Sequence, residues 1–249
     1  GSVAGGDSSG TSIKPKDPIP APSAPSGLGP FTPGGISVLA NGDRYVTDRR
    51  NDRIALMDSA GNTKLTFGGE GSEPGNFQEP WGITVDREGF VWVADTFNHR
   101  VQKFTSDGAL LFSFGGGGVS QDAGQGRNTV FFGPRDIKVG GNGRVYVTDT
   151  GNKRIQMFDS EGNFQGQVGG EGDGAGQFRE PVGLALDAAN NVYVVDTWNR
   201  RIQVLDANLK PVRSFPITAW EGLKPEELQA VDNKPYAAVS GTTLFVTSP

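Results

Sequence analysis

The chain has 249 residues, with 38 glycines, 16 prolines, no cysteine and a formal net charge of -5. The length leaves room for one large all-β domain with flanks, and the glycine and proline content is typical of many short strands joined by tight turns. The lack of cysteine excludes disulfides and cysteine zinc sites, the acidic balance disfavours nucleic acid, and no apolar run reaches the roughly 18 residues of a membrane span.

Residues 1–29 are rich in glycine and serine and then in proline. They hold too few apolar side chains to build a core, and their prolines favour an extended chain. We predict a disordered tail here. The alternative is a stalk that holds the folded domain, residues 30–249, away from something upstream.

From residue 30 onward the chain repeats one phrase four times. In the second copy, alternating apolar residues predict strands at 82–86, 90–95, 100–104 and 110–114, joined by turns that contain glycine. The aspartates that anchor the copies are 47, 54 and 47 residues apart and are Asp48, Asp95, Asp149 and Asp196. Four-stranded units at this period are typical of the blades of a β-propeller.

The fixed residues of the repeat carry a family resemblance. In the second copy they read Pro80-Trp81-Gly82-Ile83-x-Val85-Asp86 and then Val91-x-Val93-x-Asp95-Thr96-x-Asn98-x-Arg100-Val101-Gln102-x-Phe104. This pattern resembles the NHL repeat, and the resemblance extends from about residue 30 to the C-terminus. It implies an all-β, NHL-type β-propeller, a fold that is usually a closed ring of six blades.

After four full units, the sequence from Pro235 supplies only the first two strands of a fifth, and Ser248 stands where the repeat aspartate would be. We therefore predict four full four-stranded blades and a partial fifth, as part of a six-bladed ring that is incomplete at the C-terminus. Open blades expose unpaired backbone groups at their edges, so the alternative is self-association through these edges.

The charged residues of the repeat are interpreted as structural, because a set present four times is not expected of one active site. Aspartate and asparagine suit the turn between the second and third strands, and arginine can donate charge-assisted hydrogen bonds to that turn. We predict no catalytic residue in this set, which comprises Asp48, Asp95, Asp149, Asp196, Arg53, Arg100, Arg154 and Arg201.

Two further features suggest catalytic or metal chemistry and are interpreted otherwise. The glycine-rich stretches 68–77 and 169–178 lack the following helix that a dinucleotide site requires, and calcium at Glu171 and Asp173 would have too few ligands. His99, the only histidine, cannot supply a multi-histidine zinc site and is expected in a solvent-exposed loop. No cofactor is predicted.

The variable positions of the repeat gather on one face of the disc. Inner strands start and second strands end on the same side, so the residue after each repeat proline shares a face with the Asp-Thr-x-Asn loop. This face is rich in aromatic residues and arginine, which are enriched in recognition hot spots. The candidate ligand-binding residues are Trp81, Phe97, Trp198, Tyr236, Arg49, Arg50 and Arg135. The alternative is that these rings pack on neighbouring loops.

We predict a non-enzymatic propeller scaffold that presents this face to a protein, a peptide or a carbohydrate. The proline-rich segment and the resemblance favour a module of a larger extracytoplasmic bacterial protein, tethered through other regions and without direct membrane insertion. The alternative is a calcium-dependent hydrolase or lyase resembling lactonase-type propellers, for which Asp136 is the candidate metal ligand. RNA binding is disfavoured by the acidic balance, although Arg49, Arg50 and Arg135 would form a local basic patch.

Overall fold

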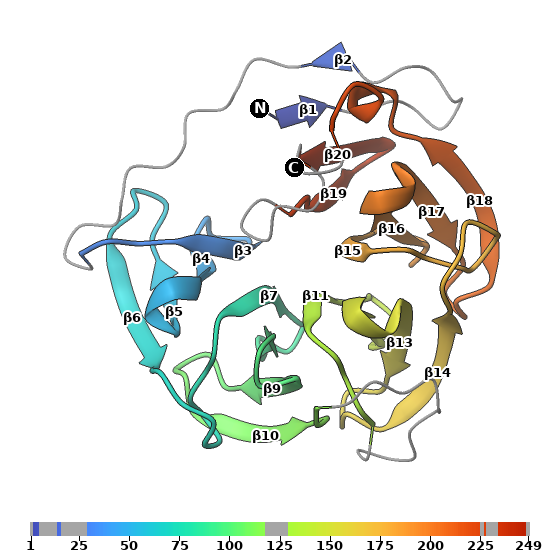
Figure 1. The fold of residues 1–249 in the computed structure, drawn as a ribbon. Helices are drawn as coiled ribbons and strands as arrows, with labels where there is room; N and C mark the ends of the chain where they lie inside the picture. The colour runs from blue at the N-terminus through green and yellow to red at the C-terminus, as the bar shows by residue number, and fades with distance from the viewer. Residues whose placement is uncertain are drawn as a thin grey trace.

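The computed structural model describes residues 2–4, 14–15, 29–117, 129–224, 227 and 234–247. The architecture is all-β, with sheets arranged around a common centre (Figure 1). The innermost strand of each sheet faces the centre and the outermost strand lies at the periphery. In the described part of the chain, no helix is long and apolar enough to cross a membrane.

Four sheets repeat one antiparallel meander. The first consists of β3 (Pro33–Val38), β4 (Arg44–Asp48), β5 (Arg53–Met57) and β6 (Thr63–Gly68). The second consists of β7 (Pro80–Val85), β8 (Val91–Asp95), β9 (Arg100–Phe104) and β10 (Leu110–Phe114). The third consists of β11 (Pro134–Val139), β12 (Val145–Asp149), β13 (Arg154–Phe158) and β14 (Phe164–Gly169). The fourth consists of β15 (Pro181–Leu186), β16 (Val192–Asp196), β17 (Arg201–Leu205) and β18 (Pro211–Pro216). The four predicted blades are confirmed.

The turns follow from the residues at their ends. Between β7 and β8, the Gly89 N–H donates to the Asp86 carbonyl, and the Phe90 N–H donates to the Asp86 side chain at 2.8 Å. Gly89 has φ of 88°, in the left-handed region that favours glycine. The Asp86 side chain therefore accepts a hydrogen bond from a backbone N–H that the tight turn leaves without a partner in the β-ladder.

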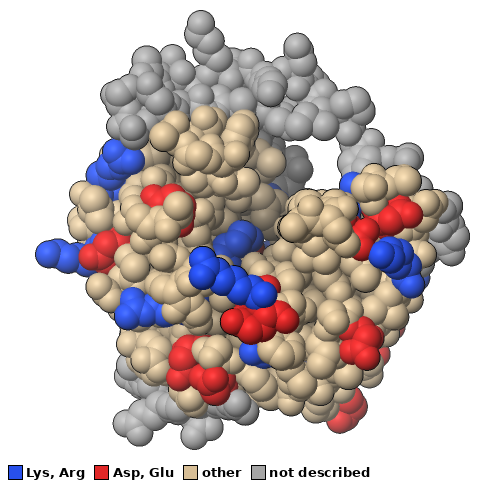
Figure 2. Space-filling model, turned by 180° about the vertical axis from the view of Figure 1, so that it is seen from behind, with Lys and Arg blue, Asp and Glu red and all other residues tan. Residues whose placement is uncertain are grey.

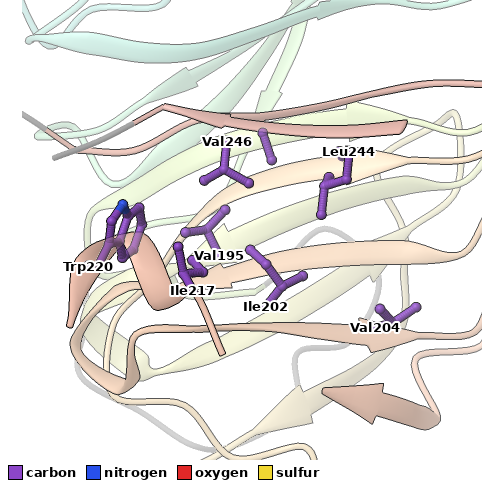
Figure 3. Close-up of a cluster of buried hydrophobic side chains, with 9 residues drawn as sticks. Val195, Ile202, Val204, Ile217, Trp220, Leu244 and Val246 are labelled. Atoms are coloured by element: carbon purple, nitrogen blue, oxygen red, sulfur yellow. The ribbon is translucent and has the colours of Figure 1, made fainter. Parts of the chain in front are cut away.

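Hydrophobic cores fill the space between neighbouring sheets. In the second, third and fourth blades, the fourth residue of the inner strand is buried and packs on the preceding blade: Ile83 on the first, Ile137 on the second and Leu184 on the third. The same layer joins the fourth and fifth sheets, where Val195, Ile202, Val204, Ile217 and Trp220 lie against Leu244 and Val246 (Figure 3). Each blade thus buries one face only when a neighbour is present.

The fifth sheet differs from the sequence expectation. It contains β19 (Ala237–Ser240) and β20 (Thr243–Thr247), followed by β1 (Ser2–Ala4) and β2 (Lys14–Pro15) from the other end of the chain. β1 pairs antiparallel with β20, with Val3 opposite Val246. The two short stretches predicted to lie in a tail are therefore strands: the edge of β20 offers backbone groups that pair with β1, and β1 in turn pairs with β2. The other residues before Gly29, and Ser248, lie outside the described residues.

One face of the first sheet, at its inner strand β3, is not covered by another described sheet. Ile36 and Val38 of β3 are exposed, whereas Ile83 and Ile137 at the position of Ile36 are fully buried. The inner strands pack on one another in the order β3, β7, β11, β15 and β19. In the other full blades, the preceding blade covers this side of the inner strand. Among the described residues, no sheet covers the corresponding side of β3. This face fits a ring of more than five blades, as the sequence predicts.

A buried lysine links the second and third sheets. The Lys103 Nζ lies 4.5 Å from the ring centroids of both Phe90 and Trp92, 3.7 Å from the Asp86 carboxylate, and donates to the Ser160 carbonyl at 3.1 Å. Aromatic faces attract a cation, and this attraction is stronger when the cation is removed from water.

The Lys103→Met variant keeps the aliphatic stem and removes the charge. We expect it to lower the free energy of unfolding by about 1–2 kcal/mol, measured by urea denaturation. Lys210→Met, at an exposed turn position, is the matched control and should change stability by less than about 0.5 kcal/mol. Equal effects of the two substitutions would show that the contacts of the Lys103 charge contribute nothing to stability.

Candidate functional site

The fixed residues of the repeat form buried networks under the loops. In the third blade, Asp149 Oδ1 accepts from the Phe132 N–H at 2.7 Å, while Oδ2 accepts from Asn152, from Arg154 Nε at 2.7 Å and from Gln156. Asp48, Asp95 and Asp196 are buried in the same way and accept from Arg53, Arg100 and Arg201. Burial raises the pKa of Asp95, and hydrogen bonds from Gln78, Asn98 and Arg100 oppose this. These carboxylates hold loops in place.

The loops themselves are single turns of 3-10 helix: η1 (Arg49–Asn51), η2 (Thr150–Asn152) and η3 (Thr197–Asn199). The first loop threonine of one blade binds the start of the next inner strand: Thr96 donates to the Pro134 carbonyl at 2.7 Å, and Thr150 donates to the Pro181 carbonyl at 2.6 Å. In the first blade this position is Arg49, so a long cationic side chain extends toward the second blade instead.

Four of the seven candidate residues lie at the axial side of this face, around Trp81. The guanidinium carbons of Arg49 and Arg135 lie 3.9 Å and 4.0 Å from the centre of the Trp81 ring. Trp81 is only 1% exposed. Gly34 leaves room for this arrangement, since a Cβ there would lie 2.9 Å from Arg49 Cγ. Three blades thus build one stack of two guanidinium groups on an indole ring.

Tyr236 is the fourth member of this axial cluster, which comprises Arg49, Trp81, Arg135 and Tyr236. It occupies the position of Trp81 and Arg135 in the fifth unit, directly before β19. Burial and the negative charge of Asp136 raise the pKa of Tyr236, and the positive charges of Arg49 and Arg135 lower it. Burial also lowers the pKa of Arg135, which Tyr236 and Glu180 oppose. The Tyr236 hydroxyl therefore lies in the electrostatic environment of both arginines.

Two acidic side chains close to the axial cluster, Asp136 and Glu180, form bonds to other groups. Asp136 Oδ1 accepts from the Ile137 N–H and from Lys138 Nζ, and Oδ2 accepts from the Leu184 N–H of the next blade at 2.8 Å. Asp136 thereby links the inner strands β11 and β15, at a position that is glycine in the other three full blades. Among the described residues, no group of three or more His, Asp or Glu side chains is placed to hold a metal ion.

Glu180 and Lys234 form a second engaged pair. Lys234 Nζ lies 2.7 Å and 2.9 Å from the two carboxylate oxygens of Glu180, and it joins the fourth blade to the segment before β19. Burial raises the pKa of Glu180, while the bond and charge of Lys234 lower it.

The remaining candidates lie on the rim of the same face and are exposed. Phe97 and Trp198 are 42% and 44% exposed, and Arg50 is exposed as well. Sequence reasoning missed a third ring, Phe132, which is 42% exposed and stands where other blades have Gln78 and Arg179. The sequence signal for this ring was an aromatic residue at a position that is polar in the second and fourth blades. The aromatic rim is defined as Phe97, Phe132 and Trp198.

His99 supports this rim and is half-buried, so the expectation of a solvent-exposed side chain was wrong. Its Nδ1 accepts from the Gly133 N–H at 3.0 Å, and its ring lies 5.4 Å from that of Phe132. The left-handed backbone of His99, with φ of 55°, turns the ring toward the next blade. His99 thus positions Phe132.

The charges on the opposite side of the molecule are mixed. Seen from behind the view of Figure 1, lysine and arginine side chains lie among aspartate and glutamate side chains (Figure 2). This view has no continuous basic track of the kind that follows a phosphate backbone.

Comparisons with known proteins agree with this architecture. The family model of the NHL repeat matches residues 77–104, and a model described as a 6-bladed beta-propeller matches residues 129–217. The search of curated proteins gave no match.

Solved structures with the same fold include three of different kinds. A nidogen/laminin complex has a TM-score of 0.63 and 21% identity, covering 88% of this chain and 72% of that chain. A catalytically inactive virginiamycin B lyase from Staphylococcus aureus with quinupristin has a TM-score of 0.60 and 16% identity, covering 99% and 70%. A protein of unknown function from Bacteroides caccae has a TM-score of 0.56 and 14% identity, covering 90% and 75%. At these identities the likeness shows the fold alone.

Proposed function

Because the chain is an NHL-repeat β-propeller, we propose that it is a non-enzymatic scaffold whose loop face binds a protein through an extended peptide segment. The observation that carries the proposal is the aromatic rim, three exposed rings from the second, third and fourth blades on one face. Aromatic side chains supply large contact area at a small entropic cost and are enriched among residues that dominate binding energy.

The rigidity of the loops strengthens this proposal. Phe97 and Trp198 each follow, by two residues, a buried aspartate that fixes its loop through several hydrogen bonds. Phe132 is fixed by its own N–H bond to Asp149. A binding surface that is ordered before the partner arrives loses less conformational entropy on association.

The kind of partner is argued from the spacing and chemistry of the rim. Separate rings on three neighbouring blades suit the side chains of one extended segment, and the fold likeness to a nidogen/laminin complex fits a protein partner. We place this scaffold outside the cytoplasm, as one module of a larger bacterial protein, on the proline-rich composition of residues 14–25.

Selection of a random peptide library displayed on phage, with the whole chain as bait, tests the proposal. We expect enriched peptides whose Kd rises roughly 30-fold in Trp198→Ser, since a hot-spot residue contributes about 2 kcal/mol. Phe245→Ser removes an exposed ring from the fifth sheet and should leave the Kd unchanged. Peptides that depend on Phe245 and not on the rim, or a library that yields no binder, would overturn the proposal.

A further inference from the structure

His99 is the only histidine of the chain, and it contacts one of the three rings of the aromatic rim. Its Nδ1 accepts from the Gly133 N–H at 3.0 Å, and its ring centroid lies 5.4 Å from that of Phe132. An imidazole nitrogen accepts a hydrogen bond only while it carries no proton, and both nitrogens are donors in the charged form. The hydrogen bond beside Phe132 therefore requires the neutral form of His99.

The first blade has the same hydrogen bond with a different acceptor. Asp52 stands at the loop position of His99, and its carboxylate accepts from the Glu79 N–H at 2.6 Å. Glu79 and Gly133 each directly precede the proline that starts the next inner strand. The two blades thus use an acceptor at one loop position to fix the segment that enters the next blade.

The third and fourth blades have a cation at this position. Lys153 Nζ pairs with the Glu171 carboxylate at 2.6 Å, and the Arg200 guanidinium donates to two backbone carbonyls that follow β18. These side chains have no acceptor, so they cannot bind a backbone N–H. A protonated His99 has the same character, because it offers donors alone, and the Gly133 N–H then loses its acceptor.

The packing around Phe132 makes its place depend on the His99 ring. A Cβ on Gly117 would lie 2.9 Å from His99 Cδ2, so the histidine ring lies close against that backbone. A Cβ on Gly151 would collide with the Phe132 ring. Phe132 is therefore held between the His99 ring and Gly151, and a turn of His99 away from Gly133 moves one of these two surfaces.

The ionisable side chains on the elements around His99 have partners of their own. In the described part of the chain these pairs are Asp95 with Arg100, Asp149 with Arg154, Lys153 with Glu171, and Asp136 with Lys138. Arg135, which begins the next inner strand with Pro134, stacks on Trp81. Burial raises the pKa of Asp95, so a test of pH dependence needs a control that removes the histidine and keeps every carboxylate.

We propose that His99 makes the aromatic rim sensitive to pH: the rim binds its peptide while His99 is neutral and releases it when Nδ1 is protonated. This inference rests on the proposed function, because the peptide is the ligand of the rim. Histidine is the side chain whose charge ordinarily changes between about pH 5 and 8, the range of mild acidification. In the charged form two donors, Nδ1–H and the Gly133 N–H, face each other, and the segment that carries Phe132 loses a hydrogen bond.

The Kd of a peptide from the phage selection, measured on the whole chain from pH 8 to pH 5, tests the proposal. We expect the Kd to rise about fivefold on acidification, which corresponds to the net contribution of one hydrogen bond. His99→Asn, an uncharged counterpart of Asp52, keeps a side-chain acceptor and should bind tightly across the whole range. His99→Lys, which introduces the residue type of the third blade, should bind weakly at every pH.

The single histidine allows the same change to be followed without a peptide. In an NMR titration of the free chain, we expect the ring signal of His99 and the amide signal of Gly133 to change with one midpoint. The change at Gly133 should be absent from the His99→Asn variant, which retains all the carboxylates of the parent chain. This readout reports the hydrogen bond itself and does not depend on the identity of the ligand.

Three results would overturn the proposal. They are a parent Kd that is unchanged or lower at pH 5, tight binding by His99→Lys, and an equal pH dependence in His99→Asn, which would assign the effect to carboxylates. If no peptide binds at any pH, the proposed function has failed, and the NMR titration still decides the role of His99. A Gly133 signal that follows the histidine ring then supports the pH-sensitive contact, and one that does not follow it overturns the contact.

Discussion

Replacing Asp149 by alanine is expected to lower the free energy of unfolding by about 3–5 kcal/mol, because it leaves a buried cation without its partner. The Arg154 side chain is 1% exposed, and its Nε lies 2.7 Å from the Asp149 carboxylate. The same carboxylate also accepts from Asn152, Gln156 and the Phe132 N–H. The substitution thus removes the acceptor of four donors at once, and urea denaturation measures the loss.

The loss of stability from the same substitution in other blades should depend on how exposed the paired arginine is. The Arg53 side chain, partner of Asp48, is 23% exposed, so water can solvate its charge once the aspartate is gone. We therefore expect Asp48→Ala to cost less than Asp149→Ala. Asp173→Ala, at an exposed loop position, is the control and should change stability by less than about 0.5 kcal/mol. Equal losses for Asp48→Ala and Asp149→Ala would contradict this explanation.

Replacing Trp81 by alanine is expected to cost about 3–5 kcal/mol of unfolding free energy, the range for removing a large buried aromatic ring. The ring is 1% exposed and is the common surface on which Arg49 and Arg135 stack. Without it, two like charges lose the aromatic face that attracts both. Trp81→Phe keeps a ring in place and should cost distinctly less.

Trp198→Ala is the matched control, since this ring is exposed on the rim and its loss should change stability by less than about 0.5 kcal/mol. Thermal and urea unfolding of the Trp81 and Trp198 variants give the comparison. If Trp81→Ala were as stable as the parent chain, the axial cluster would not be part of the core. The sequence groups both tryptophans as ligand-binding candidates, whereas the burial of Trp81 places that ring in the core.

Much of the fold could be predicted from sequence because its signals are local and repeated. Alternating apolar residues, glycine at positive φ in the turns and the recurring aspartate each act over fewer than ten residues, and four copies reinforce one another. The strands of the fifth sheet that come from residues 2–4 and 14–15 could not be predicted in the same way. β1 pairs with β20, which lies more than 200 residues along the chain, and β2 pairs with β1. No local pattern encodes the pairing of β1 with β20.

From the sequence, the candidate site could be predicted as one face of the disc. Its division into a buried axial cluster and an exposed aromatic rim could not be predicted. The repeat places Trp81 and Trp198 on the same side of the disc, yet one is buried and the other exposed. The difference arises from Gly34, which admits the Arg49 side chain over Trp81. The burial of Trp81 thus depends on contact between two blades, and the alternation of apolar residues within a single strand does not describe such contacts. Phe132 was missed because it precedes the repeat motif rather than standing within it.

Hydrogen–deuterium exchange with a peptide from the phage selection tests the central claim most directly, since it locates the binding face without a substitution. We expect the peptide to protect backbone amides of the loops at 96–99 and 197–200 and of residues 131–133. The turns on the opposite side, at 87–89 and 140–143, should exchange at unchanged rates. Protection of those turns, with the rim loops unaffected, would contradict the assignment of function to the aromatic rim.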